Sequence, residues 1–193
     1  IAALVAEREL AREPGSTVIH NLITSKAVPE IIRENGGEPV RTRVGHSFIK
    51  AKMAETNAVF GGEHSAHYYF RDFWRADSGM LAAMHVLAAL GQQDKPLSEM
   101  MAKYNRYAAS GEINSRLDSA EAQADRTEAV VKAFADRAEN VDRLDGVTVE
   151  LKDGNWFNVR ASNTEPLLRL NVEADTQEAV DALVKEILAI IRA

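Results

Sequence analysis

The chain has 193 residues, of which 46% are hydrophobic and 27% charged, and its formal net charge is −6 at pH 7. This composition is typical of a globular protein with room for one large or two small domains. The negative charge argues against nucleic acid and anionic membranes as partners, the lack of cysteine excludes disulfides and thiolate metal sites, and no apolar run approaches the ~20 residues of a membrane span.

The first part of the chain alternates between helical and strand patterns. Helical spacing already begins at the first residue, so we expect the sequence to be a fragment whose fold includes something upstream. Helices are predicted at 1–12, 25–35, from Ser47 to about Met53, from Asp77 to Leu90 and at 96–110, and strands at 17–22, 38–44 and 56–60. This alternation predicts a doubly wound α/β domain over residues 1–110.

The second part of the chain has a different pattern. Strands are predicted at 112–117, 146–151, 156–160 and 167–173, with Asp153-Gly154 as a hairpin turn, and helices at 124–139 and after Asp175. Asp175 and Glu178 have the spacing of a capping box for the last helix. The pattern predicts a small α+β domain over residues 111–193, with helices on one face of an antiparallel sheet.

Several local features follow from residue types. We expect Ser47 to cap its helix and Phe48 to lie in the buried stripe. Met80 and Met84 are expected to fill the core beside the leucines of the same helix. The pair Gly61-Gly62 is expected to permit a tight turn.

A polar loop follows the predicted strand that ends at Phe60. Glu63, Ser65 and His67 come after the glycine pair, beyond the carboxyl end of a strand, where open α/β sheets bind their ligands. A carboxylate and a hydroxyl suit the hydroxyls of a sugar. The alternative is a surface turn with a solvated Glu63 and a capping Ser65.

A second polar loop lies between two strands of the second domain. Arg160 offers a planar fork of donors, Ser162 and Thr164 offer hydroxyls, and Asn163 offers an amide. Together with backbone N–H groups these are the components of a phosphate cradle. The alternative is an ordinary polar hairpin loop.

These segments together resemble the α-D-phosphohexomutases, the phosphomannomutase/phosphoglucomutase family. Residues 62–67 resemble the family's sugar-binding loop, residues 160–166 its phosphate-binding loop, and residues 45–50 a third segment facing the active-site cleft. The resemblance covers essentially the whole chain and implies that it comprises most of the third domain and all of the fourth. Asn163 and the Glu-His-Ser combination at 63–65 are more similar to phosphomannomutases or dual-specificity enzymes than to phosphoglucosamine mutases.

The resemblance implies an isomerase of carbohydrate metabolism that converts hexose 1-phosphate into hexose 6-phosphate through a bisphosphate. Glu63, Ser65 and His67 would bind the sugar, and Arg160, Ser162, Asn163 and Thr164 would bind the phosphate that does not react. His46 would assist proton movement or contact phosphate. The alternative for both His46 and His67 is a structural hydrogen bond.

The groups that perform the transfer are expected elsewhere in the protein. A catalytic phosphoserine (a phosphoprotein state) and the aspartates that hold Mg²⁺ are expected upstream, a hexose 1,6-bisphosphate is expected as activator, and the location is expected to be cytoplasmic. The fragment alone is therefore expected to be inactive. The alternatives are a phosphoglucosamine mutase, a non-catalytic phosphosugar-binding module or, least favoured, a structural interaction module.

Two positions depart from the family pattern. Ala66 stands where a glycine is usual, which is tolerable if the backbone there is not left-handed. Ile23 stands where many members carry a lysine, and Lys26 is the nearest residue that could replace its charge.

Overall fold

The computed structural model describes residues 1–162 and 165–193, which form two compact units, Ile1–Arg106 and Tyr107–Ala193. The first unit contains five helices and five strands among the described residues. In chain order they are α1 (Ala2–Arg12), β1 (Thr17–Asn21), α2 (Ala27–Glu34), β2 (Glu38–Thr42), α3 (His46–Thr56), β3 (Phe60–Gly62), β4 (Tyr68–Phe70), β5 (Ala76–Asp77), α4 (Gly79–Leu90) and α5 (Leu97–Ala102).

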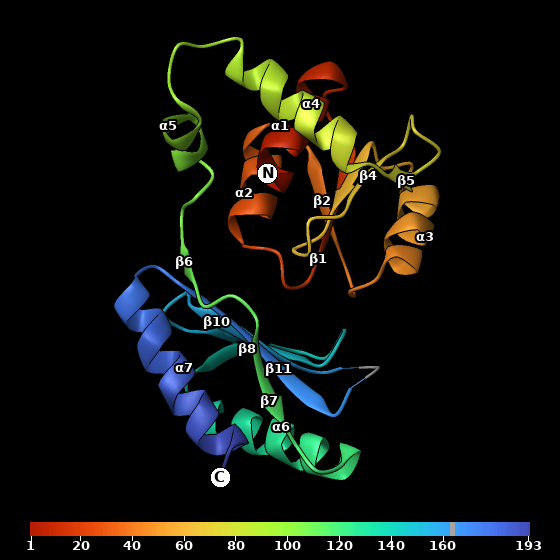
Figure 1. The fold of residues 1–193 in the computed structure, drawn as a ribbon. Coiled ribbons are helices and arrows are strands. Elements are labelled where there is room, and N and C mark those ends of the chain that lie inside the picture. Colours follow the sequence, from red (N-terminus) through yellow and green to blue (C-terminus); the bar gives the residue numbers. More distant parts are fainter. Residues whose placement is uncertain (163–164) are drawn as a thin grey trace. The chain divides into compact units, whose positions relative to one another are not determined.

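The sheet of the first unit has the order β2-β1-β3-β4-β5 (Figure 1). β1 pairs in parallel with both β2 and β3, while β4 and β5 continue from β3 as an antiparallel meander. Parallel neighbours need helical crossovers, and α2 and α3 provide them. This arrangement confirms the predicted α/β class.

The glycine pair lies inside β3, not in a turn as predicted. A Cβ atom at Gly61 would lie 2.9 Å from Ile49 of α3, and one at Gly62 would lie 2.9 Å from Ala2 of α1. Successive strand residues face opposite sides of a sheet, so α1 and α3 cover opposite faces. The two glycines therefore let a helix approach the sheet closely on each side, which makes the unit doubly wound.

Three further predictions for the first unit are wrong. α3 begins at His46 after Gly45, without a cap from Ser47, and Phe48 is exposed with the guanidinium of Arg43 4.4 Å from its ring centre. Met80 and Met84 are 79% and 59% exposed, so they are not core residues. Their apolar character had indicated burial, but α4 turns Ala82 inward instead.

The last helix of the first unit is also shorter than predicted. α5 ends at Ala102, and residues 108–109 form a strand that belongs to the second unit. Arg106 lies between these elements and pairs with Glu34 of α2 at 2.6 Å. None of the described helices is long and apolar enough to span a membrane.

The second unit is an antiparallel sheet packed on one face by two helices (Figure 1). Its elements are β6 (Ala108–Ala109), β7 (Ile113–Arg116), α6 (Ala120–Phe134), β8 (Ala138–Asp142), β9 (Val147–Leu151), β10 (Trp156–Ala161), β11 (Leu167–Ala174) and α7 (Gln177–Ile191). The sheet order is β6-β11-β10-β9-β8, and β7 pairs with β11 beside β6. The predicted α+β antiparallel architecture is confirmed.

Alternation along the strands creates the core of the second unit. Val159, Leu168 and Leu170 point to the helix side, where they meet Phe134 and Ile187. The residues between them therefore form a polar face on the other side of the sheet.

Helix boundaries were the weak part of the prediction in this unit. α6 starts four residues earlier than predicted because Ser119 caps it, accepting a hydrogen bond from the N–H of Ala122. α6 also ends at Phe134, earlier than predicted, and the residues that follow form β8, which was not predicted. α7 is capped by Thr176 rather than by Asp175.

Candidate functional site

Glu63 is fixed by three donors from three different segments. Tyr69 of β4 donates its hydroxyl to Oε1 at 2.6 Å, and Oε2 accepts from Nδ2 of Asn21 at 3.4 Å and from the backbone N–H of Gly45 at 3.3 Å. Gly45 has φ 125°, a conformation that favours glycine. A carboxylate has about four acceptor positions, so one remains for a ligand hydroxyl.

The environment of Glu63 also acts on Tyr69. Burial, and next the hydrogen bond to the carboxylate, raise the pKa of the Tyr69 hydroxyl. Tyr69 therefore stays a neutral donor. Asn21 is itself held, since its Oδ1 accepts from the Thr24 hydroxyl at 2.6 Å and from the N–H of His64 at 3.4 Å.

The loop at residues 62–67, predicted to bind sugar and hereafter the sugar loop, closes as a tight turn. The N–H of Glu63 donates to the carbonyl of His67 at 2.9 Å, and the N–H of Ala66 donates to the carbonyl of Glu63 at 3.1 Å. Ala66 has φ 65°, which is left-handed. The condition under which alanine would replace glycine without strain is therefore not met.

We expect Ala66→Gly to stabilise the protein by about 1 kcal/mol, because glycine adopts the left-handed region without the steric cost that an L-residue bears. This corresponds to a rise in melting temperature of roughly 2–4 °C for a chain of this size. Thermal denaturation would measure it. Ala76→Gly in β5 is the control and should have the opposite sign, since glycine weakens a strand at an ordinary φ; equal shifts would contradict the strain at Ala66.

His67 is paired with Asp77 at the other side of the loop. Its Nδ1 lies 2.7 Å from Oδ2 of Asp77, whose Oδ1 accepts from the N–H of Tyr68 at 2.8 Å. The hydrogen bond that His67 donates to Asp77 raises the pKa of the imidazole, against a smaller opposing effect of burial. For Asp77 itself burial alone would raise the pKa, but the Tyr68 N–H and His67 together lower it.

We expect Asp77→Asn to return the pKa of His67 toward its ordinary value of 6.5. The loss of the carboxylate removes the main stabilisation of the imidazolium. An NMR titration of the His67 ring protons would measure the change. Asp72→Asn is the control, because Asp72 pairs with Arg71 instead; a His67 titration that follows Asp72 and ignores Asp77 would contradict the pairing.

These groups line one cavity of about 490 Å³ in the first unit. Its lining residues are Val44, Gly45, His46, Lys50, Glu63, Ser65, His67, Tyr69 and Asp77. The structure thus brings together the predicted residues Glu63, Ser65, His67 and His46. Lys50 of α3 is exposed and also lines the cavity.

The phosphate loop, residues 160–166, is partly described. Arg160 at the end of β10 is 7% exposed, and Ser162 accepts a hydrogen bond at Oγ from Nη2 of Arg169 at 3.3 Å. The N–H of Ser162 donates to the carbonyl of Leu167 at 2.8 Å, which closes the loop. Asn163 and Thr164 lie outside the described residues.

Family models match both units in sequence. The model for the phosphoglucomutase/phosphomannomutase alpha/beta/alpha domain III matches residues 1–107, and the model for the C-terminal domain matches residues 112–190. The chain belongs to the phosphoglucomutase/phosphomannomutase family.

Relatives of known name agree with this family. A phosphomannomutase of Methanocaldococcus jannaschii is 39% identical over 99% of the chain and 41% of its own length, and one of Escherichia coli is 39% identical over 100% and 42%. A phosphoglucomutase/phosphomannomutase family structure from Burkholderia thailandensis superposes with a TM-score of 0.81 at 30% identity, covering 99% of this chain and 41% of that one. The chain therefore spans about two fifths of the length of these family members.

More distant family structures share the fold. N-acetylphosphoglucosamine mutase of Aspergillus fumigatus, solved with glucose 1,6-bisphosphate, has a TM-score of 0.63 at 16% identity and covers 99% of this chain and 42% of that one. This likeness concerns the fold alone.

Sequence reasoning missed the residues that position the site. No role in the site was predicted for Tyr69 or Asn21, and Asp77 was expected only to start a helix. Their roles depend on strand register: Gly61 lies opposite Tyr69, and Tyr69 lies opposite Asp77, which aligns β3, β4 and β5 behind the loop. A tyrosine two residues after a predicted ligand on a short hairpin was the available signal.

A metal site was expected outside this chain. Among the residues that the structure describes, no group of three or more His, Asp or Glu side chains is placed to hold a metal ion. We therefore assign no metal ligand to these residues.

Proposed function

We propose that this chain is the sugar- and phosphate-recognition part of a hexose phosphate mutase that interconverts hexose 1-phosphate and hexose 6-phosphate. The observation that carries the proposal is the carboxylate of Glu63, which three donors hold in place and which lines a cavity together with Ser65 and His67. Membership of the family supports the class of reaction.

Within this proposal the two loops divide the substrate between them. Glu63 accepts a hydrogen bond from one ring hydroxyl and Ser65 binds a second, while Arg160 and Ser162, with Asn163 and Thr164, bind the phosphate that does not react. When the hexose phosphate binds in its two orientations, its ring hydroxyls occupy equivalent places. One site can therefore bind the sugar whether the 1-position or the 6-position is the one that reacts. Such a reaction depends on positioning and charge stabilisation, so recognition groups can lie apart from the groups that transfer the phosphoryl.

The transfer itself is assigned to the remainder of the protein. A phosphoserine gives its phosphoryl group to the free hydroxyl of a hexose phosphate, and the resulting 1,6-bisphosphate, turned around, returns the other phosphoryl group to the serine. The phosphoserine, Mg²⁺, the bisphosphate activator and a cytoplasmic location belong to the proposal. His67, whose Nδ1 is held by Asp77, lines the cavity and is a candidate for contact with the sugar, and His46 at the start of α3 is a candidate for contact with phosphate.

A binding experiment on the 193-residue chain tests this division. In ¹H–¹⁵N spectra, mannose 1-phosphate should shift the amide signals of both the sugar loop and the phosphate loop, whereas inorganic phosphate should shift only those of the phosphate loop. Shifts confined to the phosphate loop with both compounds would overturn the assignment of Glu63 and Ser65 to the sugar.

We expect no mutase turnover from this chain alone, even with Mg²⁺ and glucose 1,6-bisphosphate, because the described residues offer only recognition groups. A coupled assay with mannose 1-phosphate and with glucose 1-phosphate measures it, with the natural polypeptide that contains these residues as the positive control. Turnover by the 193 residues would contradict the assignment of the transfer to the remainder of the protein. Binding of hexose phosphate by a natural polypeptide without turnover would favour the non-catalytic module instead.

A further inference from the structure

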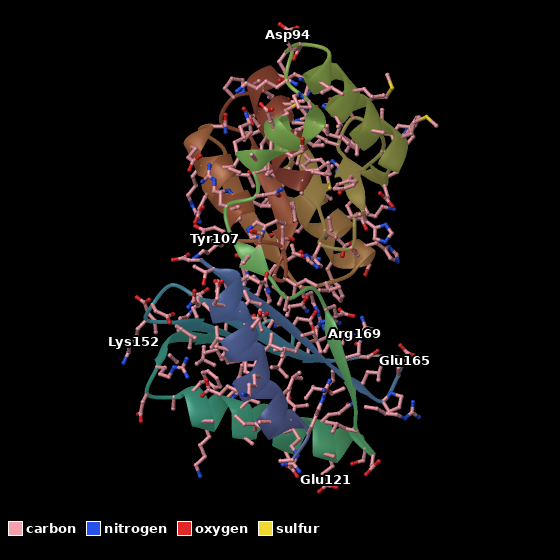
Figure 2. All side chains as sticks on the ribbon, turned by 60° about the vertical axis from the view of Figure 1, so that its left-hand side comes forward. Asp94, Tyr107, Glu121, Lys152, Glu165 and Arg169 are labelled. Carbon is pink, nitrogen blue, oxygen red and sulfur yellow. The ribbon has the colours of Figure 1, made fainter. Side chains whose placement is uncertain are left out.

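The solvent side of α4 is entirely apolar. The helix spans Gly79–Leu90 and contains no charged residue. After its first residue, the exposed positions have the spacing i, i+3, i+4, i+7 and i+8, and they are Met80, Ala83, Met84, Leu87 and Ala88, hereafter the apolar stripe. Met80, Met84 and Leu87 are 79%, 59% and 60% exposed, and side chains that carry sulfur project outward from this helix in Figure 2.

The opposite side of α4 is already packed, so the stripe cannot turn inward. Ala82 is buried, and the ring of His85 stacks on Phe70 of β4 with 5.5 Å between the ring centres. Nε2 of His85 also lies 3.2 Å from Oε1 of Glu9 on α1. These contacts hold α4 against α1 and β4 in one rotational setting, with the stripe outward (Figure 1).

Such a stripe is unusual on a helix at the surface. Helices that are apolar on all sides are normally buried, and a surface helix carries polar groups on its outer side. α3 of the same unit follows this rule, since Lys52 and Glu55 form an exposed pair on it. A continuous exposed apolar surface indicates a place where another part of a protein binds.

The family of the chain indicates what covers the stripe. Residues 1–107 match domain III, so family members contain domains numbered before it, and this chain spans only 41% of the length of a named relative.

The beginning of α1 lies beside the beginning of α4. The N–H of Ser78, the cap of α4, donates to the carbonyl of Tyr68 at 2.9 Å, and Tyr68 lines a cavity of about 190 Å³ together with Ile1. A polypeptide that continues before Ile1 would therefore enter next to the first turn of the stripe.

Covalent attachment favours this occupant over a second copy of the chain. A domain joined to the same polypeptide meets the stripe at an effective concentration on the order of millimolar, whereas a second copy meets it only at the concentration of the protein in solution. Methionine suits such a contact, because its flexible and polarisable side chain packs against surfaces of many shapes.

We propose that the apolar stripe of α4 is the docking surface for a domain that precedes these residues in the natural polypeptide. Met80, Met84 and Leu87 form the contact with apolar side chains of that domain. No residue of the stripe lines the cavity of Glu63, so docking at α4 is independent of the proposed function.

Oxidation of methionine measures whether the stripe is covered. Dilute hydrogen peroxide converts exposed methionine into its sulfoxide, which mass spectrometry locates in the sequence. We expect Met80 and Met84 to oxidise about tenfold more slowly in the natural polypeptide than in the 193-residue chain, because oxidation follows exposure. Met53, which is 0% exposed, should resist in both proteins, and added N-acetylmethionine reports that the oxidant dose is equal. Equal rates for Met80 and Met84 in the two proteins would overturn the proposal.

A charge placed in the stripe tests the same contact by another route. Met84→Lys should leave the melting temperature of the 193-residue chain nearly unchanged, because exposed substitutions have small effects. In the natural polypeptide the same variant should remove most of the protection of Met80. Leu144→Lys is the matched control, because Leu144 is an apolar residue of the second unit that is 44% exposed, and it should leave the protection intact. Protection of Met80 that survives Met84→Lys would refute docking at the stripe, and Met84→Gln replaces this variant if the lysine prevents folding.

The dependence on protein concentration separates an attached domain from a second copy. Protection by an attached domain is the same at every concentration, whereas protection by a second copy follows mass action and falls on dilution. We expect the protection of Met80 in the natural polypeptide to persist on dilution. Protection that is lost on dilution, or a dimer in sedimentation that Met84→Lys converts into monomers, would overturn the proposal in favour of a contact between two copies.

Discussion

Glu63→Gln is expected to lower kcat/KM for hexose phosphate by about 10- to 150-fold in the natural polypeptide that contains these residues. Hydrogen bonds to a charged group contribute about 1.5–3 kcal/mol, and the substitution replaces a carboxylate that accepts from Tyr69, Asn21 and Gly45 while keeping one position for the sugar. A coupled mutase assay measures the ratio.

The variant is informative because it separates sugar recognition from phosphate recognition. In the 193-residue chain, Glu63→Gln should abolish the extra shifts that mannose 1-phosphate causes over inorganic phosphate. Glu55→Gln is a suitable control, since Glu55 forms an exposed pair with Lys52 on α3. Unchanged kcat/KM in a folded Glu63→Gln protein would refute the role of Glu63 in the site.

The second large effect is expected on stability in acid. His20 on β1 is 7% exposed, and burial is the main cause that lowers its pKa to about 4. A hydrogen bond to the Asn21 carbonyl opposes the shift, and the charges of Arg41 and Arg33 add to it. His20 is therefore neutral in the folded protein across the neutral and mildly acidic range.

The direction of the effect follows from the two pKa values. Below the unfolded value of about 6.5 the unfolded chain binds a proton that the folded chain refuses, so stability falls with pH down to the folded value of about 4. The expected loss is about 2 kcal/mol at pH 5 and about 3 kcal/mol at pH 4 relative to neutral pH. His85, whose pKa is lowered mainly by burial, adds to the same slope.

Urea denaturation at several pH values measures this slope. Because the chain forms two compact units, the probe should report on the first unit, such as the amide signals of β1. His20→Gln should reduce the loss of stability between pH 7 and pH 4, while the exposed His64→Gln should leave it unchanged. An acid slope that is the same with and without His20 would contradict the burial argument.

The sequence predicted the parts of the fold that depend on local periodicity. The β1 and β10 patterns, the turn at Asp153-Gly154 and the positions of both polar loops followed from residue types alone. Met80 and Phe48 were wrong for a physical reason: helical spacing identifies an apolar stripe but does not say whether anything covers it. The cap at Ser119 was missed because several polar residues precede α6 and any of them can accept the first N–H groups.

The sequence predicted several of the residues that line the cavity, but not the residues that hold them in place. Glu63 and Arg160 stood out because a carboxylate suits the hydroxyls of a sugar and a guanidinium suits the oxygens of a phosphate. Tyr69, Asp77 and Arg169 did not stand out, because their contacts depend on the register between paired strands. Some of these strands are distant in the sequence, and others are joined by a short hairpin. Register depends on the whole sheet, whereas a motif depends only on neighbours in the chain.

If Glu63 binds the sugar as proposed, its three hydrogen bonds have a consequence for how substrate preference can change in this protein. A substitution there leaves the buried hydroxyl of Tyr69 and the amide of Asn21 without their acceptor, so it removes folding stability together with recognition. The side chains of His64 and Ser65 are exposed, so their substitution would not leave a buried group without a partner. We therefore expect adaptation to a different hexose to occur by substitution of His64 and Ser65, while the carboxylate of Glu63 is retained.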